Sequence, residues 1–354
     1  MTGVEAAIGF SDLPPLARRP VLVVVIGVVL VVVLAVLSVG VGSTWIAPAQ
    51  IWAALSGDGP ATAQTHIVVG LRLPRTLIAI VAGGMLALAG TVLQSATRND
   101  LADPSLVGVS GGAVLAVVAT LFFTGWDAVP APWSTLLAFA GGIGASALIW
   151  LLSWSEGSPR SARLVLDGVL ISAVLSALVS VLLILDGALF GTVLRWVVGS
   201  LNGRVWQDWA ALWPVAVVAV PLGLLIARLL DALWLGDEVA AATGVRPVTA
   251  RGAALAVATL LTAGAVSVVG AIGFIGLVAP HIARLLVGER PARVLLPAVL
   301  VGGALLVGAD LLAQTLSLLM PASEVGGRTA LPAGAVTAIV GGPVLFTLLA
   351  RRTR

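Results

Sequence analysis

Residues 71–112, LRLPRTLIAIVAGGMLALAGTVLQSATRNDLADPSLVGVSGG, place two arginines, a proline and a polar loop within an otherwise apolar sequence. The surrounding composition is that of a membrane protein, because 59% of the 354 residues are hydrophobic, only 10% are charged and the mean hydropathy is +1.13. Charged groups are costly inside a bilayer, so this stretch is expected to serve a function. The chain is predicted to be an integral membrane protein.

Polar residues divide the chain into about ten segments that are long enough to cross a membrane, which takes about 20 apolar residues. Their runs are apolar on every face instead of alternating, which predicts helices and not a β-barrel. The predicted spans are 20–42, 73–95, 105–124, 134–153, 164–185, 210–230, 250–268, 270–287, 294–316 and 332–350. The division between the seventh and eighth is the least marked. We therefore predict an all-α polytopic fold over residues 20–354, after an N-terminal tail of residues 1–19.

Arginine placement predicts the orientation of the chain, which contains no lysine. With ten spans and the N-terminus inside, most of the 19 basic residues fall on the N-terminal side of the membrane. The opposite side receives Arg72, Arg75, Arg195, Arg204 and Arg328. Because cytoplasmic loops carry an excess of basic residues, both termini are expected to be cytoplasmic.

The composition also excludes several kinds of chemistry. Without lysine the chain has neither a P-loop nor a Schiff base, and without cysteine it has no thiolate nucleophile or zinc-thiolate site. The two histidines, His66 and His281, are predicted on opposite sides of the membrane and so cannot share a metal ion. We expect no catalytic site, no metal and no cofactor.

Two acidic residues lie within predicted spans, where paired carboxylates would indicate an ion-coupled secondary transporter or an intramembrane hydrolase. Asp167 has Arg163 four residues earlier on the same helical face, which favours a local ion pair. Asp310 has no partner nearby in the sequence and is interpreted as a helix-packing or vestibule residue. The secondary transporter stays an alternative for which no ion site is identified.

Arg72 and Arg75 flank Pro74 and are predicted to share a face at the outer end of the second span. Two cations there oppose the charge bias of the rest of the chain. They could extend to anionic lipid headgroups. They could equally bind carboxylates of a soluble partner through charge-assisted hydrogen bonds. Position alone does not decide between these interpretations.

Five blocks of sequence follow one another in order along nearly the whole chain and carry a resemblance to a known family. The first comprises RLPR, LALAG, Gln94 and RNDLADPSLVGVSGG. The others are RWVVGSLNGRVW from Arg195, LGDEVAAATGV from Leu235, GAIGFIGLVAPHIARLLVG from Gly270 and LPAGAVTAIVGGPVLF from Leu331. In this series the chain resembles the iron-siderophore and cobalamin class (FecCD-like) of ABC importer permeases.

That resemblance implies a type II ABC importer permease fold with no chemistry of its own, in a bacterial cytoplasmic membrane. It implies three kinds of partner: a second permease subunit, identical or paralogous, two cytoplasmic ABC ATPase subunits and an extracytoplasmic substrate-binding protein. Arg72 and Arg75 are then expected to dock acidic side chains of the binding protein. Many relatives carry a further outer arginine where this chain has Gln314, and Arg328 is expected to substitute for it.

The resemblance also places two cytoplasmic gate loops, one between the second and third spans and one before the fifth. Relatives usually have a proline where this chain has Asp100, so a turn with a fixed φ is lost there. The gate residues are Asn99, Asp100, Leu101, Ala102, Asp103, Pro104, Ser161, Ala162 and Arg163.

ATPase coupling is expected in residues 233–247, between the sixth and seventh spans. Gly236 and Asp237 can begin a short helix there, Gly244 can end it, and acidic residues suit its first turn. A connecting helix on the membrane surface would have the same pattern, and the resemblance favours coupling. The residues assigned to it are Leu235, Gly236, Asp237, Glu238, Ala241 and Gly244.

The cargo is the feature that the sequence determines least. The block from Arg195 resembles siderophore permeases more than the cobalamin type, in which glycine-rich variants are usual. We therefore expect a ferric siderophore, with haem or cobalamin as alternatives, and no nucleic-acid partner.

Overall fold

A computed structural model describes residues 19–42, 44–56, 63–125, 131–154, 161–186, 196–319 and 330–352, and the regular elements within these ranges are all helical. Each of the ten predicted spans overlaps a different helix, and seven of these helices are long and apolar enough to cross a membrane, so the all-α fold predicted from the sequence is confirmed. The helices that the ten spans overlap are α1 (Pro20–Gly40), α4 (Leu73–Thr97), α5 (Val109–Thr124), α6 (Ala131–Trp154), α7 (Ser161–Leu185), α9 (Trp206–Leu225), α12 (Pro247–Val269), α13 (Ile275–Val287), α14 (Pro291–Leu319) and α15 (Ala333–Arg352).

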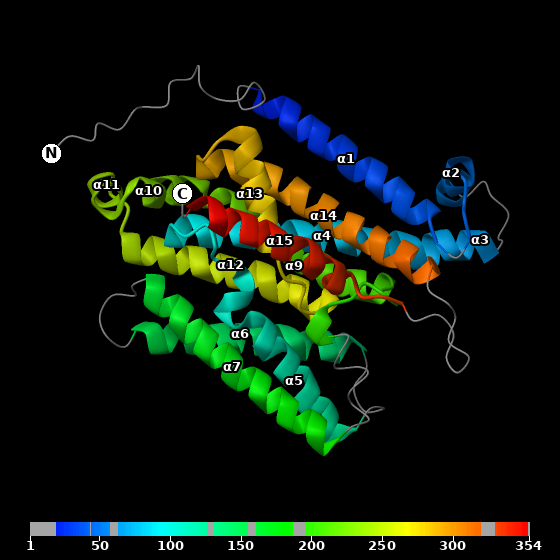
Figure 1. Cartoon of the computed structure of the whole chain (residues 1–354), viewed down its shortest axis with the longest axis horizontal. Helices are drawn as coiled ribbons and strands as arrows, with labels where there is room; N and C mark the ends of the chain where they lie inside the picture. The colour runs from blue at the N-terminus through cyan, green and yellow to red at the C-terminus, as the bar shows by residue number, and fades with distance from the viewer. Residues whose placement is uncertain are drawn as a thin grey trace.

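Short elements connect the long helices. They are α2 (Pro48–Ser56), α3 (Ala63–Thr65), a π-helical turn His66–Arg72 that leads into α4, a 3-10 turn Pro104–Val107, α10 (Ala227–Leu235) and α11 (Asp237–Ala242). Figure 1 shows α10 and α11 at one end of the bundle and α2 and α3 at the other. These short elements therefore mark two opposite ends of the bundle.

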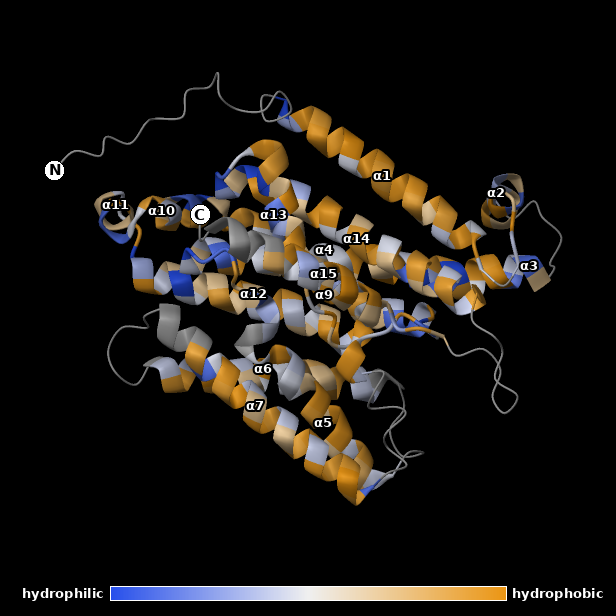
Figure 2. Ribbon diagram, in the orientation of Figure 1, coloured by the Kyte–Doolittle hydropathy of each residue, from blue (hydrophilic) through white to orange (hydrophobic). Residues whose placement is uncertain are grey.

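The core of the bundle is built around α4. Its apolar span is 83% buried, whereas the spans of α1 and α7 are 17% and 11% buried. In Figure 1 α4 lies in the middle, with α1 and α7 at opposite margins. Figure 2 shows α1 and α7 as mainly hydrophobic along their lengths, with hydrophilic residues concentrated toward the ends of the bundle. Such apolar outer surfaces suit contact with lipid or with another membrane helix.

Two glycine contacts bring α4 against its neighbours. A side chain at Gly83 would overlap the carbonyl oxygen of Gly302 in α14, and one at Gly90 would overlap the carbonyl oxygen of Gly276 in α13. Since only glycine leaves room for these backbones to approach, the small residues of the quoted stretch are explained by packing.

The chain has a non-helical break between α12 and α13, where the sequence separates the seventh and eighth predicted spans. Residues 270–274 are not helical, and α13 has only 13 residues, about 20 Å of helix. Hydrogen bonds from distant segments satisfy the backbone around the break. The N–H of Ala271 donates to Trp196 O at 3.0 Å, and the N–H of Ser200 donates to Val269 O at 2.9 Å. Residues 196–200 are thereby bound to the end of α12 and the beginning of the break.

Candidate functional site

Arg72 is held within the fold at the predicted outer end of α4. Its side chain is buried, and its guanidinium donates to the carbonyl oxygens of Val39 at 2.8 Å, Gly40 at 3.0 Å and Thr44 at 2.8 Å. These acceptors belong to the last turn of α1 and the residues that follow. Arg72 therefore satisfies carbonyls that the end of a helix leaves without a partner.

Arg75 forms a bidentate ion pair with Asp310 of α14. Its Nε and Nη2 atoms lie 2.8 Å and 2.7 Å from the two carboxylate oxygens. The side chains are 18% and 1% exposed, respectively. Arg75 Nη2 also donates to Asn202 Oδ1 at 2.7 Å, and Gln314 Nε2 donates to Asp310 Oδ2 at 2.9 Å. We call these four residues the outer polar network.

This network corrects two expectations. Asp310 does have a partner nearby in the sequence, because Gln314 is one helical turn further along α14. Arg72 ends the π-helical turn, Arg75 lies in the first turn of α4, and the two bond to different parts of the chain, so their side chains do not point to one common target. Arg328, the third residue expected in docking, lies outside the described residues. The docking role of the three arginines stays a prediction.

The first predicted gate loop, residues 99–104, lies against α13. Gln94 Nε2 donates to Ala102 O at 3.3 Å and to Gly276 O at 3.2 Å, which joins α4, the loop and α13. Asp103 accepts hydrogen bonds from the N–H of Ser105 at 2.8 Å and from the backbone N–H of Phe274. The loop backbone is therefore fixed by side chains at several points along its length.

Asp100, where the family resemblance leads us to expect a proline, pairs with Arg284 near the end of α13. The Arg284 Nη1 atom lies 3.4 Å from Asp100 Oδ1, and Arg284 Nη2 donates to Gln94 Oε1 at 2.6 Å. Asn99 O accepts from the N–H of Ala102 at 3.0 Å, and Asn99 Oδ1 accepts from Leu101 N at 3.1 Å. These bonds order the turn without a proline.

The second predicted gate segment forms the first turn of α7, which begins at Ser161. The side chains of Ser161, Ala162 and Arg163 lie outside the described residues, so the ion pair predicted between Arg163 and Asp167 stays a prediction. Asp167 accepts a hydrogen bond from Ser153 Oγ of α6 at 2.7 Å. The carboxylate thus links α7 to α6 near the predicted cytoplasmic side.

The expected coupling segment contains the short helix that the sequence predicts. Gly236, with φ of 121°, precedes α11, and Gly244, with φ of 82°, follows it by two residues. Leu235 ends α10, Asp237 and Glu238 form the first turn of α11, and Ala241 O accepts from the N–H of Gly244 at 3.0 Å.

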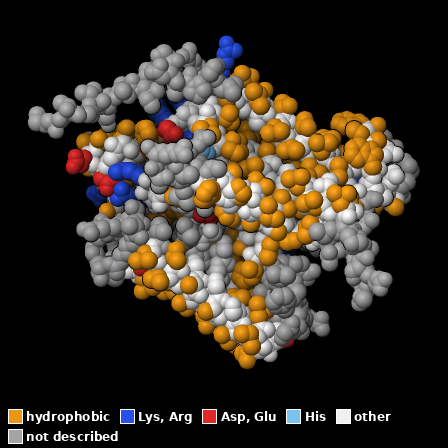
Figure 3. All heavy atoms as spheres, viewed as in Figure 1, with side chains coloured by type: hydrophobic (Ala, Val, Ile, Leu, Met, Phe, Trp, Pro, Cys, Tyr) orange, Lys and Arg blue, Asp and Glu red, His pale blue; other side chains and the backbone are white. Residues whose placement is uncertain are grey.

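Asp237 connects the coupling segment to the long helices of the bundle. Its carboxylate pairs with Arg98, the left-handed residue that ends α4, and with Arg251 of α12 at 2.7 Å. Burial alone would raise the pKa of the Asp237 carboxyl, but the hydrogen bonds and charges of Arg251 and Arg98 lower it below its ordinary value of 3.8. Figure 3 shows charged side chains gathered at this end of the molecule.

The functional residues that sequence reasoning missed are mainly the arginines that bind the predicted gate and coupling segments. No individual role was predicted from the sequence for Arg98, Arg251 or Arg284, yet each binds a residue of the predicted gate or coupling segments. Acidic residues at the same membrane boundary as these arginines were the available signal. Spacing does not reveal such pairs, because the partners are far apart in the sequence.

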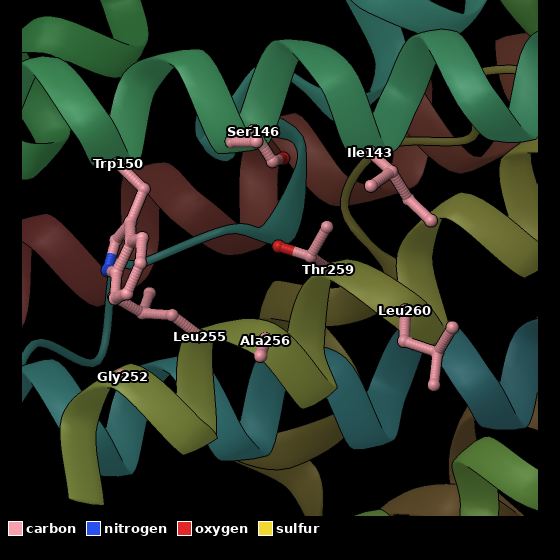
Figure 4. Close-up of a pocket in the computed structure, with 9 residues that line it drawn as sticks. Ile143, Ser146, Trp150, Gly252, Leu255, Ala256, Thr259 and Leu260 are labelled. Atoms are coloured by element: carbon pink, nitrogen blue, oxygen red, sulfur yellow. The ribbon is translucent and has the colours of Figure 1, made fainter. Parts of the chain in front are cut away.

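An apolar cavity of about 340 Å³ lies between α6 and α12. Figure 4 shows Trp150 and Gly252 near one end and Ile143 and Leu260 near the other. The lining contains the hydroxyl groups of Ser146 and Thr259 but no charged side chain. It therefore does not have the chemistry expected of a site for a charged iron chelate.

Comparisons with known proteins agree with the architecture. The model of the FecCD transport family matches residues 30–351. The Fe(3+)-citrate import system permease protein YfmE of Bacillus subtilis is 36% identical over 334 residues, which are 94% of this chain and 96% of that protein. The cobalamin import system permease protein BtuC of Halobacterium salinarum is 39% identical over 298 residues, 83% of this chain and 75% of that protein.

A solved structure is also similar over nearly its whole length. It is described as an inward-facing conformation of a metal-chelate type ABC transporter, and it superposes with a TM-score of 0.79 at 26% identity. The match covers 93% of this chain and 98% of that chain. The helices of the present chain are therefore arranged as in a transporter of that type.

Proposed function

The chain belongs to the FecCD transport family, and from this premise we propose that it carries a ferric siderophore through the cytoplasmic membrane as the permease subunit of an ATP-driven importer. Permeases of this family are transport subunits of ABC importers and are not themselves catalytic. The single observation that supports an iron chelate as cargo is the near full-length similarity to a permease named for Fe(3+)-citrate import. Haem and cobalamin are the alternative cargoes.

The proposed assembly contains a second permease subunit, two ABC ATPase subunits and an extracytoplasmic binding protein. The permease partner would be a second copy or a paralogue. Coupling to the ATPases is assigned to α11, a six-residue helix at the charged end of the bundle. The assignment is supported by the ties of Asp237 to Arg98 and Arg251, because force applied to α11 would reach α4 and α12 through them.

Docking of the binding protein is assigned to Arg72 and Arg75, at the end of the bundle opposite α11, and to Arg328, which lies outside the described residues. Arg75 keeps 18% of its side chain exposed. The gate is assigned to residues 99–104 and to Ser161, Ala162 and Arg163. Both termini are assigned to the cytoplasm, on the basis of the arginine distribution.

Uptake into proteoliposomes tests the proposal. The permease pair and ATPases would be reconstituted with the binding protein outside, and ferric citrate or a ferric trihydroxamate carrying radioactive iron would be supplied. We expect uptake that requires ATP and the binding protein, and no competition by excess haem or cobalamin. Competition by either would reassign the cargo within the family. Uptake without ATP, driven by a proton or sodium gradient, would support the ion-coupled alternative instead.

A further inference from the structure

The gate loop, residues 99–104, contacts both ends of α13. Near the beginning of the helix, the Asp103 carboxylate accepts the backbone N–H of Phe274, whose φ of 69° places it in the left-handed region. In the last turn of the helix, Arg284 pairs with Asp100 at 3.4 Å. Phe274 and Arg284 are about 15 Å apart along the helix axis. Two carboxylates of one short loop therefore reach the two ends of one short helix.

Gln94 of α4 joins the loop and the helix between these points. Its amide donates to Ala102 O of the loop and to Gly276 O of α13, while its Oε1 accepts from Arg284 at 2.6 Å. The Arg284 side chain is only 8% exposed, so acceptors within the protein compensate its charge in place of water, with Gln94 Oε1 and the Asp100 carboxylate among them. Arg284 thus binds the side-chain amide of Gln94, which is itself bound to the loop, and also pairs with the Asp100 carboxylate of the loop.

From this arrangement, and given the transport role proposed above, we propose that Arg284 is a positioning residue that fastens the gate loop to α13, so that the loop and the helix move as one body. Asp100 is the accessible point of this fastening, with 50% of its side chain exposed. Ions and water reach it directly. The ion pair at this point supplies the order that a proline would otherwise supply.

Space for movement exists beside the beginning of α13. An apolar cavity of about 190 Å³ lies between α13, α14 and α15, and Phe274, Gly308 and Gly341 contribute to its lining. A cavity without filling side chains offers little resistance to displacement of the helix that borders it. A shift of α13 into this space would withdraw the gate loop with it.

The test uses the absence of native cysteine. An Ala102→Cys reporter, at a position only 1% exposed, would be placed in the complete importer in nanodiscs and labelled with a membrane-impermeant maleimide. Asp100→Asn should raise the labelling rate about two- to fivefold, the effect of losing a partly exposed ion pair. Arg284→Gln should raise it about tenfold, because Gln94 loses its partner as well. Arg284→Lys should restore part of the protection.

Glu289→Gln is the matched control, since Glu289 also lies near Arg284, at 3.8 Å, but is not in the loop. It should leave labelling unchanged. Increasing the salt from about 0.1 M to 1 M should raise labelling of the parent and not of Asp100→Asn, because only the parent has the pair to screen. A merely structural role would not produce this difference.

Equal labelling of the parent and Asp100→Asn, or an equally large effect of Glu289→Gln, would overturn the fastening. Asp100 is half-exposed, so the Asp100→Asn comparison does not depend on how well Arg284→Gln folds. The labelling needs no cargo. Loss of iron uptake with the labelling pattern intact would therefore count against the proposed function alone, and uptake without the pattern would count against the fastening alone.

Discussion

Arg75 and Asp310 lie 235 positions apart in the sequence, yet they form a largely buried ion pair at the end of the molecule that is predicted to be outer. A bidentate contact between a guanidinium and a carboxylate is strong and directional. Its strength also makes each partner dependent on the other, because removing one leaves a buried charge without compensation. The pair therefore ties α4 to α14 and, through Asn202, to loop 196–205.

Asp310→Asn should lower the free energy of unfolding by about 3 kcal/mol, since Arg75 would lose its carboxylate in a poorly hydrated site. Thermal unfolding of the purified chain in detergent measures the change. Adding Arg75→Gln to Asp310→Asn should recover part of the loss. Arg290→Gln is the control, because Arg290 pairs with Asp231 at the surface and is 60% exposed; it should cost less than about 1 kcal/mol. Equal losses for the two single variants would contradict the assigned importance of burial.

The ion pairs of Asp237 predict how the stability of α11 depends on pH. The pKa of Asp237 is lower in the folded chain than its ordinary value of 3.8, so the pair stabilises the segment above that value and is lost as the pH falls through the lowered pKa. Amide hydrogen exchange of residues 237–242, corrected for intrinsic rates, should therefore be constant between about pH 5 and pH 8. Asp237→Asn should increase exchange throughout this window. A progressive loss of protection from pH 8 to pH 5 in the parent would contradict the assignment.

At the scale of single residues, the sequence predicted which charged residues matter better than it predicted which residues they bind. Arg72 and Arg75 were singled out because charge is unusual in so apolar a chain, and Asp237 because an acidic residue suits the first turn of the short helix predicted there. Arg284 was quoted within a family block but received no role, because its partners come from α4 and the loop before α5. Hydrogen-bond partners of this kind depend on tertiary geometry, which spacing along one helix does not encode.

The elements themselves were more predictable. Long apolar runs fix where helices lie, and even the weakly marked division at residues 268–270 corresponds to the end of α12 at Val269. The sequence did not predict how far the break would extend or that α13 would be so short. Those features depend on Trp196 and Ser200, whose backbone groups bond to Ala271 within the break and to Val269 at the end of α12.

Glycine positions in α14 give a prediction at the scale of elements. Gly302→Ala should destabilise the chain by about 1 to 3 kcal/mol, because the new methyl group would overlap Gly83 and Ala87 of α4 and force the helices apart. Gly308→Ala, in the same helix, should be neutral or stabilising by up to about 1 kcal/mol, because nothing lies within 4 Å of the added carbon. Thermal unfolding measures both. The reverse order would mean that α4 and α14 do not meet at these glycines.

At the scale of the whole molecule, the two polar ends are predicted to have separate functions. Arg75→Gln combined with Asp310→Asn removes a docking charge without leaving its partner unpaired, and should weaken capture of the binding protein about tenfold. Assembly with the ATPases should stay intact. Biolayer interferometry on nanodiscs measures the first property, and co-purification measures the second.

Changes at the opposite end should have the opposite effect. Gly236→Val with Glu238→Lys should preserve capture of the binding protein but reduce the cargo transported per ATP hydrolysed, because the start of α11 would be distorted at a φ of 121°. The measurement is uptake and phosphate release in the same proteoliposomes. If both sets of variants impair the same step, the assignment of the two sides is wrong.

The position of α1 at the margin has a mechanical consequence. Its span is only 17% buried, but its last carbonyl groups, at Val39 and Gly40, accept hydrogen bonds from Arg72. If the chain is pulled out of a membrane by its N-terminus in a single-molecule force experiment, the 21 residues of α1 should unfold first. Their stretched length is about 70 Å. The next force maximum should occur at the arginine, where the peripheral helix is anchored to the body of the protein.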